Sequence, residues 1–455
     1  MTNSMILSIV ISLICVIPMT SRAQESDIST TVYNDNLALV KDVRKMSLEK
    51  GTREVKFRDV AAKIDPTSVH IKSITATDKI AVLEQNYEYD LVDVDKLLEK
   101  YVDQEIKVYT KDKVYSGILL SAQRNDIMLK EADGSVRVIN RTAMLNLEFP
   151  ALPEGLITRP TLVWSLDNQK AGEHQIEVSY LTTGINWHAE YVAVSKADDK
   201  QLEISGWVSI DNKSGAAYEN AKLKLVAGDV HRVEPPRPVM IHAESAMLAK
   251  AAAAPQFEEK SFFEYHLYTL QRRATLKNNQ IKQISLFPAA VCAVKKIYAY
   301  DGSRDNKKVR VNLEFKNSER NGLGMPLPKG KIRVYKEDEA DKSLEFIGED
   351  LIEHTPKDEK VRVFLGNAFD IIGERNQLEY KKLGKNSREE TWQIKLRNHK
   401  DEAVRITLIE HAYGDWEIRR KTHQIIRQDA NTIEFDVPVA TDGEAILEYV
   451  ILFRW

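Results

Sequence analysis

The histidines and carboxylates of the chain are the residues that could bind a metal ion, but they do not follow a known spacing. Zinc hydrolases hold the metal with ligands clustered by spacing, as in His-Glu-x-x-His on a helix, and the ten histidines here occur singly. The nearest approach to a cluster is a set of residues that a hairpin could bring together, Glu410, His411, Asp415 and His423. Charged residues at a hairpin end are usually solvated. We therefore expect no metal site and no cofactor.

Two hydrolytic chemistries can be tested against the sequence. A nucleophilic serine commonly lies in Gly-x-Ser-x-Gly on a sharp strand-to-helix turn, and the sequence lacks this motif. Glycoside cleavage needs two carboxylates that face each other across a cleft. Because the chain has 68 acidic residues, the sequence cannot select such a pair. No catalytic residue is assigned, and a hydrolase stays open as an alternative.

Several aromatic residues raise the question of ligand binding. Sugar-binding surfaces use exposed flat rings beside polar groups, whereas a β-sandwich core buries the same rings. Trp187, His188 and Trp416 are the candidates for a binding surface, and burial in the core is the other interpretation. For Phe263 and Tyr265, which lie in one predicted strand, we expect core positions.

The N-terminus has the features of a secretory signal peptide. Residues Met5–Ile17 are nearly all apolar, which is the length of a signal-peptide core and short for a membrane span. Small residues at Ser21 and Ala23 predict cleavage between Ala23 and Gln24. No lysine or arginine precedes the apolar run, so an uncleaved anchor or a lipoprotein modified at Cys15 remains an alternative. We expect the mature protein in the periplasm or at the cell surface, with no later membrane helix.

Charge and cysteine content limit the partners and the means of stabilisation. The chain has 68 acidic and 65 basic residues, and removing residues 1–23 with their single charge, Arg22, changes the net charge from −3 to −4. Such a balance provides no overall field to attract nucleic acid, so we expect no nucleic-acid partner. Cleavage leaves one cysteine, Cys292, inside an apolar run, where we expect it to be buried and unpaired.

The hydrophobic pattern predicts a mainly β protein with several antiparallel sandwich or barrel domains and few helices. Apolar and polar residues alternate at Ile176–Tyr180, Val309–Phe315 and Ile433–Val439, as in half-buried strands. The predicted divisions are a signal peptide at 1–23, a β-domain at 28–90, a helix with a small barrel at 92–150, a larger β-domain at 158–387 with a Pro- and Ala-rich linker at 233–256, and an Ig-like sandwich at 388–455.

The segment 92–150 is similar to an Sm-like or SH3-like barrel in the order of its elements. A short helix precedes five short strand patterns, and Gly117 lies in the second of them. A glycine there is typical of a bent strand that crosses close to its neighbour. Sm-like proteins bind RNA, but their specific contact motifs are not matched here, and a structural barrel is the favoured interpretation.

Two stretches, Ser179–Tyr191 and Phe263–Leu270, resemble a known family when taken in order with Leu323–Gly330 and Gly414–Trp416. The family is that of exported proteins with the DUF4139 domain, whose better-known relatives are labelled mucoidy-inhibitor-like. The resemblance spans roughly residues 28–455, and 92–150 occupies the place where many relatives carry other material. It implies a β-rich fold and a cell-envelope context, but no activity and no functional residues.

Together these observations predict an exported, non-enzymatic binding or assembly module for envelope proteins or glycans. The alternative is a hydrolase acting on envelope polymers. A pocket with two facing carboxylates, or a clustered His/Asp/Glu set, would favour the enzyme. An exposed aromatic strip or a flat edge strand would favour binding. The sequence does not determine the oligomeric state.

Overall fold

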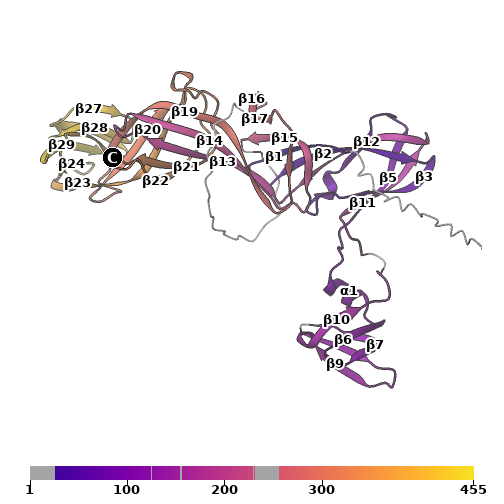
Figure 1. The fold of residues 1–455 in the computed structure, drawn as a ribbon. Coiled ribbons are helices and arrows are strands. Elements are labelled where there is room, and N and C mark those ends of the chain that lie inside the picture. Colours follow the sequence, from indigo (N-terminus) through magenta and orange to yellow (C-terminus); the bar gives the residue numbers. More distant parts are fainter. Residues whose placement is uncertain (1–25, 124, 154–155, 229, 231–255) are drawn as a thin grey trace, which may run out of the picture.

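The computed structural model describes residues 26–123, 125–153, 156–228, 230 and 256–455 (Figure 1). Ala23, Gln24 and nearly all of the 233–256 linker therefore lie outside the described residues. The expectation of a mainly β chain with several antiparallel sheets is confirmed, and α1 (Val94–Lys100) is the one α-helix in the described part. No helix in this part is long and apolar enough to cross a membrane.

An eight-stranded sheet, the first sheet, runs in the order β16-β17-β15-β1-β2-β12-β4, with β18 beside β15. Its strands are β1 (Ser26–Tyr33), β2 (Ala38–Leu48), β4 (His70–Ser73), β12 (Gly172–Thr182), β15 (Tyr218–Ala227), β16 (Phe257–Phe262), β17 (Tyr265–Leu270) and β18 (Ala274–Leu276). Ile176, Val178 and Tyr180 of β12 are buried, and the residues between them are half-buried. The alternation in the sequence thus fixes which face of this strand joins the core.

A thirteen-stranded sheet, the long sheet, follows the order β22-β21-β13-β14-β19-β20-β23-β24-β29-β26, and β25, β28 and β27 branch from β19. Its first strands are β13 (Ile185–Ser195), β14 (Gln201–Asn212), β19 (Gln280–Tyr300), β20 (Lys308–Lys316), β21 (Gly330–Glu337), β22 (Leu344–Ile352) and β23 (Lys360–Lys382). The remaining strands are β24 (Ser387–Asn398), β25 (Val404–His411), β26 (Asp415–Lys421), β27 (Ile425–Gln428), β28 (Thr432–Val439) and β29 (Gly443–Arg454). Short 3-10 turns lie at Pro66–Ser68, Arg141–Ala143 and Glu319–Asn321.

Strand β19 takes part in two hydrophobic cores. Residues 280–293 of β19 pair with β14, while its last residues pair with β20 and, in parallel, with β25. The first core gathers buried side chains of the first sheet and of β13, β14, β19 and β21, including Trp187, Tyr191 and Tyr268. The second core contains Tyr300 at the end of β19 together with side chains of the last strands.

The strands predicted for residues 388–455 are present as β24, β25, β26, β28 and β29, and β27 is an additional short strand. Their core also contains Tyr298, Tyr300, Val309 and Ile371, which precede the predicted boundary at 388. These four residues belong to β19, β20 and β23. Strand β19 pairs with β25, β23 pairs with β24, and β20 lies between β19 and β23 in the long sheet. Residues 388–455 therefore share their core with three earlier strands.

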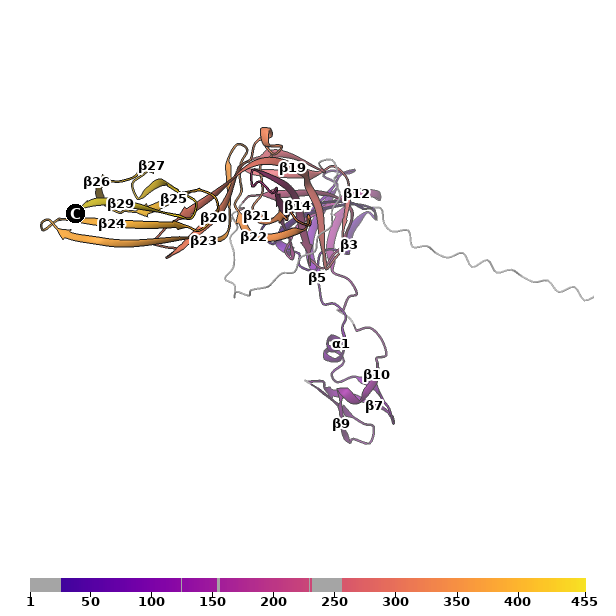
Figure 2. The same cartoon turned by 60° about the vertical axis from the view of Figure 1, so that its left-hand side comes forward.

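A three-stranded sheet of β3 (Gly51–Arg58), β11 (Thr161–Asn168) and β5 (Ile80–Glu88) carries the segment 92–150, which we call the small unit. The strands of the small unit are β6 (Glu105–Thr110), β7 (Val114–Ser121), β8 (Asp126–Lys130), β9 (Val136–Asn140) and β10 (Met144–Glu148). The small unit has its own core and projects from the body in both views (Figures 1 and 2). Glu88 pairs with Thr161, so the small unit enters and leaves through neighbouring residues of one antiparallel pair.

Gly117 of β7 explains why the small unit needs a glycine in its second strand. A Cβ atom at this position would lie 2.5 Å from the carbonyl oxygen of Lys130 in β8, closer than real Cβ atoms approach backbone. The expectation that a glycine marks a close strand crossing is confirmed.

Candidate functional site

The structure separates the three aromatic and histidine candidates. Trp187 is 1% exposed, and its indole N–H donates to the carbonyl of Val226, so the ring lies in the core and not on a surface. His188, the next residue of β13, faces the other way and is half-exposed beside Glu190. Trp416 is half-exposed on β26, and β26 and β13 are separated by many strands of the long sheet. These residues do not form one site.

The expectation that Phe263 lies in the core is wrong. Phe263 is 82% exposed and has a φ of 56°, because Phe263 and Glu264 form the two-residue turn between β16 and β17. The aromatic run was interpreted as one continuous strand, and the turn divides it. Tyr265, the first residue of β17, is half-buried.

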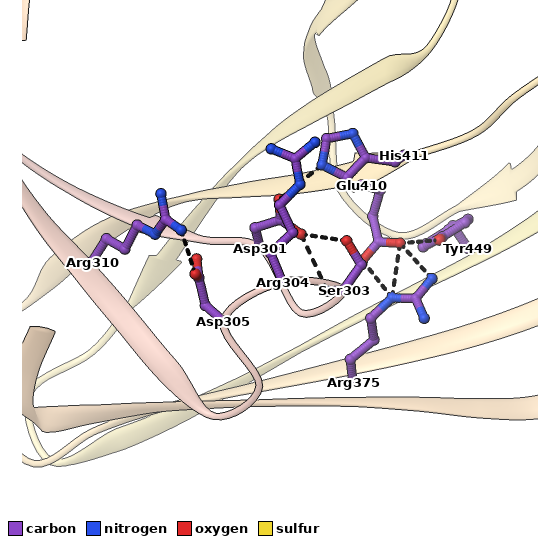
Figure 3. Close-up of polar contacts among 9 residues, drawn as sticks. All are labelled: Asp301, Ser303, Arg304, Asp305, Arg310, Arg375, Glu410, His411 and Tyr449. Atoms are coloured by element: carbon purple, nitrogen blue, oxygen red, sulfur yellow. Dashed lines mark hydrogen bonds and ion pairs between the residues drawn. The ribbon is translucent and has the colours of Figure 1, made fainter. Parts of the chain in front are cut away.

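A deeply buried ionic cluster lies in the second core (Figure 3). Glu410 of β25 is 2% exposed, and Arg375 of β23 donates to it through Nε and Nη2 at 2.9–3.0 Å. Tyr449 of β29 donates its hydroxyl to the same carboxylate. The Arg375 guanidinium also lies 3.3 Å from the ring centroid of Trp392 in β24. Strands β23, β24 and β29 are neighbours in the long sheet, and the cluster joins them across the core to β25, which pairs with none of them.

Burial and the nearby charges set the ionisation of this cluster. Burial raises the pKa of Tyr449, and the neighbouring Glu410 carboxylate raises it further. Burial alone would lower the pKa of Arg375, but the hydrogen bonds to Glu410 raise it above its usual value. Arg375 therefore stays charged, and Tyr449 stays protonated as a donor. Such a closed arrangement stabilises the fold and leaves no carboxylate oxygen poised for a substrate.

A second polar group adjoins the first through His411 (Figure 3). Asp301, just after β19, lies 2.8 Å from His411 Nε2, and it accepts hydrogen bonds from the hydroxyl and the N–H of Ser303. Arg304 lies 3.5 Å from the same carboxylate. Burial would raise the pKa of Asp301, but the hydrogen bonds from Ser303 and His411 hold it below its ordinary value.

This second group contains the residue types of a hydrolase, but in a different order. In a catalytic triad, histidine lies between the serine and the carboxylate so that it can take the serine proton. Here Asp301 lies between Ser303 and His411, and Ser303 donates to the carboxylate within a tight turn. A carboxylate with a lowered pKa is a weak base, so Ser303 is not activated. The geometry favours a structural role.

The four residues considered for a metal site are not brought together. Glu410 pairs with Arg375, and His411 pairs with Asp301. Asp415 pairs with Arg454, and His423 contacts Thr422. Within residues 26–123, 125–153, 156–228 and 256–455, no group of three or more His, Cys, Asp or Glu side chains is arranged to hold a metal ion.

Sequence reasoning interpreted Glu410 as a solvated hairpin residue and did not find Arg375 or Tyr449 as its partners. One signal was available: Glu410 occupies an inward position in the alternation of β25, in register with the apolar residues Ile406 and Leu408. An acidic residue on an apolar face implies a buried cationic partner. The pattern could not identify that partner, because β23 and β29 do not pair with β25 and contact it only across the core.

Comparison with known proteins gives one positive result. A family model described as a domain of unknown function, DUF4139, matches residues 176–413. The chain belongs to the DUF4139 family. The matched residues run from β12 to the loop after β25, so Arg375 and Glu410 lie inside the DUF4139 match and Tyr449 lies outside it. A search of curated proteins found no match.

Outside the DUF4139 match, the small unit carries an exposed apolar surface. We call it the β7–β9 face, and its members are Ile118, Leu120, Met128, Val136 and Val138, each 37–58% exposed. Met128 lies opposite Val138, and Lys130 lies between Ile118 and Val136, so these side chains occupy one side of three adjacent strands. The inward residues of the same strands, such as Leu119 and Ile127, fill the core. The sequence showed these apolar residues, but only the register places them together.

Proposed function

We propose that this chain is a non-enzymatic binding or assembly module that works outside the cytoplasm, and that the β7–β9 face of the small unit is its docking surface. The observation that carries the proposal is the cluster of five exposed apolar side chains on a unit that projects from the body. Exposed apolar surface is costly in water, and contiguous patches of it mark interaction sites.

The chemistry of the β7–β9 face favours a protein partner over a glycan or a nucleic acid. Its members are aliphatic or thioether side chains, whereas sugar and base recognition rely on aromatic rings for stacking. Flexible methionine side chains such as Met128 suit protein surfaces that must adapt to one another. We therefore commit to an envelope protein that presents a complementary aliphatic surface.

The edge of the sheet supports the same partner class. β9 is the last strand in the order β10-β6-β7-β8-β9, so its outer backbone groups face away from the sheet. Val136 and Val138 of β9 belong to the β7–β9 face. A partner strand added along β9 would extend both the hydrogen-bond ladder and the apolar face.

Export of the mature chain is part of the proposal and rests on the apolar run at Met5–Ile17 with Ser21 and Ala23 before Gln24. N-terminal sequencing of the protein recovered from a cell-envelope fraction should begin at Gln24 or its cyclised form. A retained Met1 would contradict the cleavage.

The docking proposal is tested with a variant that places charge on the face. An envelope protein that the wild type captures by cross-linking is first identified and purified. In the mature full chain, Met128→Glu with Val138→Glu should then abolish binding to this protein. Both side chains point to solvent, so the variant should fold. The matched control, Leu351→Glu with Phe369→Glu, changes two apolar residues of the body that are 71% and 95% exposed.

The measurement is the binding of the purified partner to each purified variant. Loss of binding in the face variant with retention in the control supports the proposal. Equal binding by both variants overturns it. Sedimentation of the wild type and of the face variant, each without partner, adds a further outcome. If the wild type self-associates and the face variant does not, the occupant is a second copy, and the envelope-protein assignment is wrong.

A further inference from the structure

A cavity of about 250 Å³ is lined by residues of the long sheet. Strands β19, β20, β21, β22 and β23 all contribute to its wall, together with the turn between β13 and β14. Its apolar lining residues are Val311, Leu313, Ile347 and Leu365. Its charged lining residues are two lysines and an aspartate. The cavity shares no lining residue with the small unit, so its binding chemistry is independent of the proposed docking.

The cavity lining includes two lysines and one aspartate, and a further carboxylate, Glu402, acts on Lys296. The carboxylate of Asp199 accepts hydrogen bonds from Lys296 at 2.5 Å and from Lys336 at 2.7 Å. Burial would raise the pKa of Asp199, yet the two ammonium groups lower it, and the Asp199 hydrogen bond raises the pKa of Lys296 although burial opposes this. Asp199 and Lys296 are therefore charged at neutral pH.

The ammonium groups also keep hydrogen-bonding capacity. Lys296 donates to Asp199, and Lys336 donates to Asp199 and to the carbonyl of Ala197. Two ammonium groups carry six N–H donors, so three of the six make no hydrogen bond to the described part of the chain. The two ammonium groups share one hydrogen-bonded carboxylate, so an anion that enters the cavity would be able to accept the remaining N–H donors.

We propose that this cavity binds a small organic carboxylate with an apolar tail. The carboxylate would accept hydrogen bonds from Lys296 and Lys336, and the tail would lie against Val311, Leu313, Ile347 and Leu365. A cavity of 150 Å³ holds benzene, so the present cavity suits a carboxylate with a chain of roughly five to seven carbons. A carboxylate headgroup can accept the remaining N–H donors, whereas inorganic phosphate would leave the apolar lining residues without contacts.

Calorimetric titration of the mature full chain with hexanoate at low salt tests this assignment. We expect saturable binding of hexanoate, weaker binding of hexanol and of inorganic phosphate, and no binding of hexylamine. Hexanoate affinity should fall as salt is added. Hexanol binding as tight as hexanoate would overturn the assignment, because the lysines would then play no part. Absence of hexanoate binding would overturn it as well.

Two substitutions change the charge of the site in opposite directions. Lys336→Met keeps the length of the side chain and removes one cation, so hexanoate should bind about tenfold or more weakly. Asp199→Asn removes the internal competitor for the ammonium groups, so hexanoate should bind more tightly. The control Lys357→Met removes a lysine paired with Glu319 outside the cavity and should leave the affinity unchanged. Weaker binding by Asp199→Asn in folded protein would contradict the proposal, since electrostatics requires the opposite sign.

Discussion

The hydroxyl of Tyr449 in β29 donates a hydrogen bond to the carboxylate of Glu410 in β25, across the core and not along a strand ladder. The two residues come from strands that do not pair with each other. The bond therefore ties the two faces of the second core at one point. Arg375 of β23 adds to this link, because its Nε and Nη2 atoms both donate hydrogen bonds to the Glu410 carboxylate.

Removing Glu410 should destabilise the second core more than removing any surface charge. Glu410→Ala leaves the Arg375 guanidinium half-buried without its counter-ion, which typically costs about 3–5 kcal/mol. Tyr449→Phe removes only a donor to a charged group, and we expect a loss of about 1.5–3 kcal/mol. Urea unfolding followed by tryptophan fluorescence measures both. The surface control Glu417→Ala, which loses its ion pair with Arg454, should change stability by less than about 1 kcal/mol. Equal effects of Glu410→Ala and Glu417→Ala would contradict the role assigned to the cluster.

Asp301 predicts a pH dependence of stability. Its pKa in the folded chain lies below the ordinary value of 3.8, so its ionised form is stabilised by folding. This contribution is fully present above pH 3.8 and is lost as the pH falls through the lowered folded pKa. The difference in unfolding free energy between wild type and Asp301→Asn should therefore narrow as the pH falls below 3.8. Unfolding curves across the acidic range measure it, and a constant difference would count against the pairing with His411 and Ser303.

Gly117→Ala should loosen the small unit while the body keeps its stability. The added methyl group would press on the Lys130 carbonyl, and overpacking of this kind costs about 1–3 kcal/mol. Hydrogen exchange should become faster in peptides from β6, β7 and β8 and stay unchanged in β13 and β14. Ser116→Ala is the neighbouring control, since it removes only an exposed hydrogen bond to Glu105. Unchanged exchange in Gly117→Ala would show that the two strands can separate without loss.

Cys292 should react slowly with thiol reagents in the folded mature chain. It is buried and free, as the sequence predicted, and burial raises the pKa of its thiol to about 11. At pH 8 only roughly one thiol in a thousand would be ionised, even if a reagent reached it. Absorbance assays with an aromatic disulfide should show slow labelling in buffer and fast labelling in concentrated guanidinium. Cys292→Ala provides the blank, and native labelling as fast as denatured labelling would contradict the burial.

The sequence predicted the strands well because most of them bury one face. In β12 and β13 the alternation of apolar and polar residues follows the burial of each side chain. The pattern failed where conformation depends on a single turn, as at Phe263, or where pairing joins distant segments. The parallel pairing of β1 with β15 has no local signature, because it brings Ser29 beside Lys222.

The sequence predicted the candidate sites less well than the strands. Lys296 and Lys336 belong to different strands, and nothing in their neighbourhoods distinguishes them from solvated lysines. They share Asp199 only because β19 and β21 lie on opposite sides of the β13-β14 hairpin in the long sheet. The apolar members of the β7–β9 face were visible in the sequence, but whether they point inward or outward depends on the register of three strands.

The 21 residues of β19 have a consequence for how this chain can change over evolutionary time. Residues of β19 as far as Val294 belong to the first core, and Tyr298 and Tyr300 belong to the second. A recombination event within β19 would therefore interrupt the long sheet between the two cores. The small unit, in contrast, could be exchanged for unrelated sequence between Glu88 and Thr161 without disturbing a single shared strand. Descendants of this chain should therefore vary most in what they carry at that position.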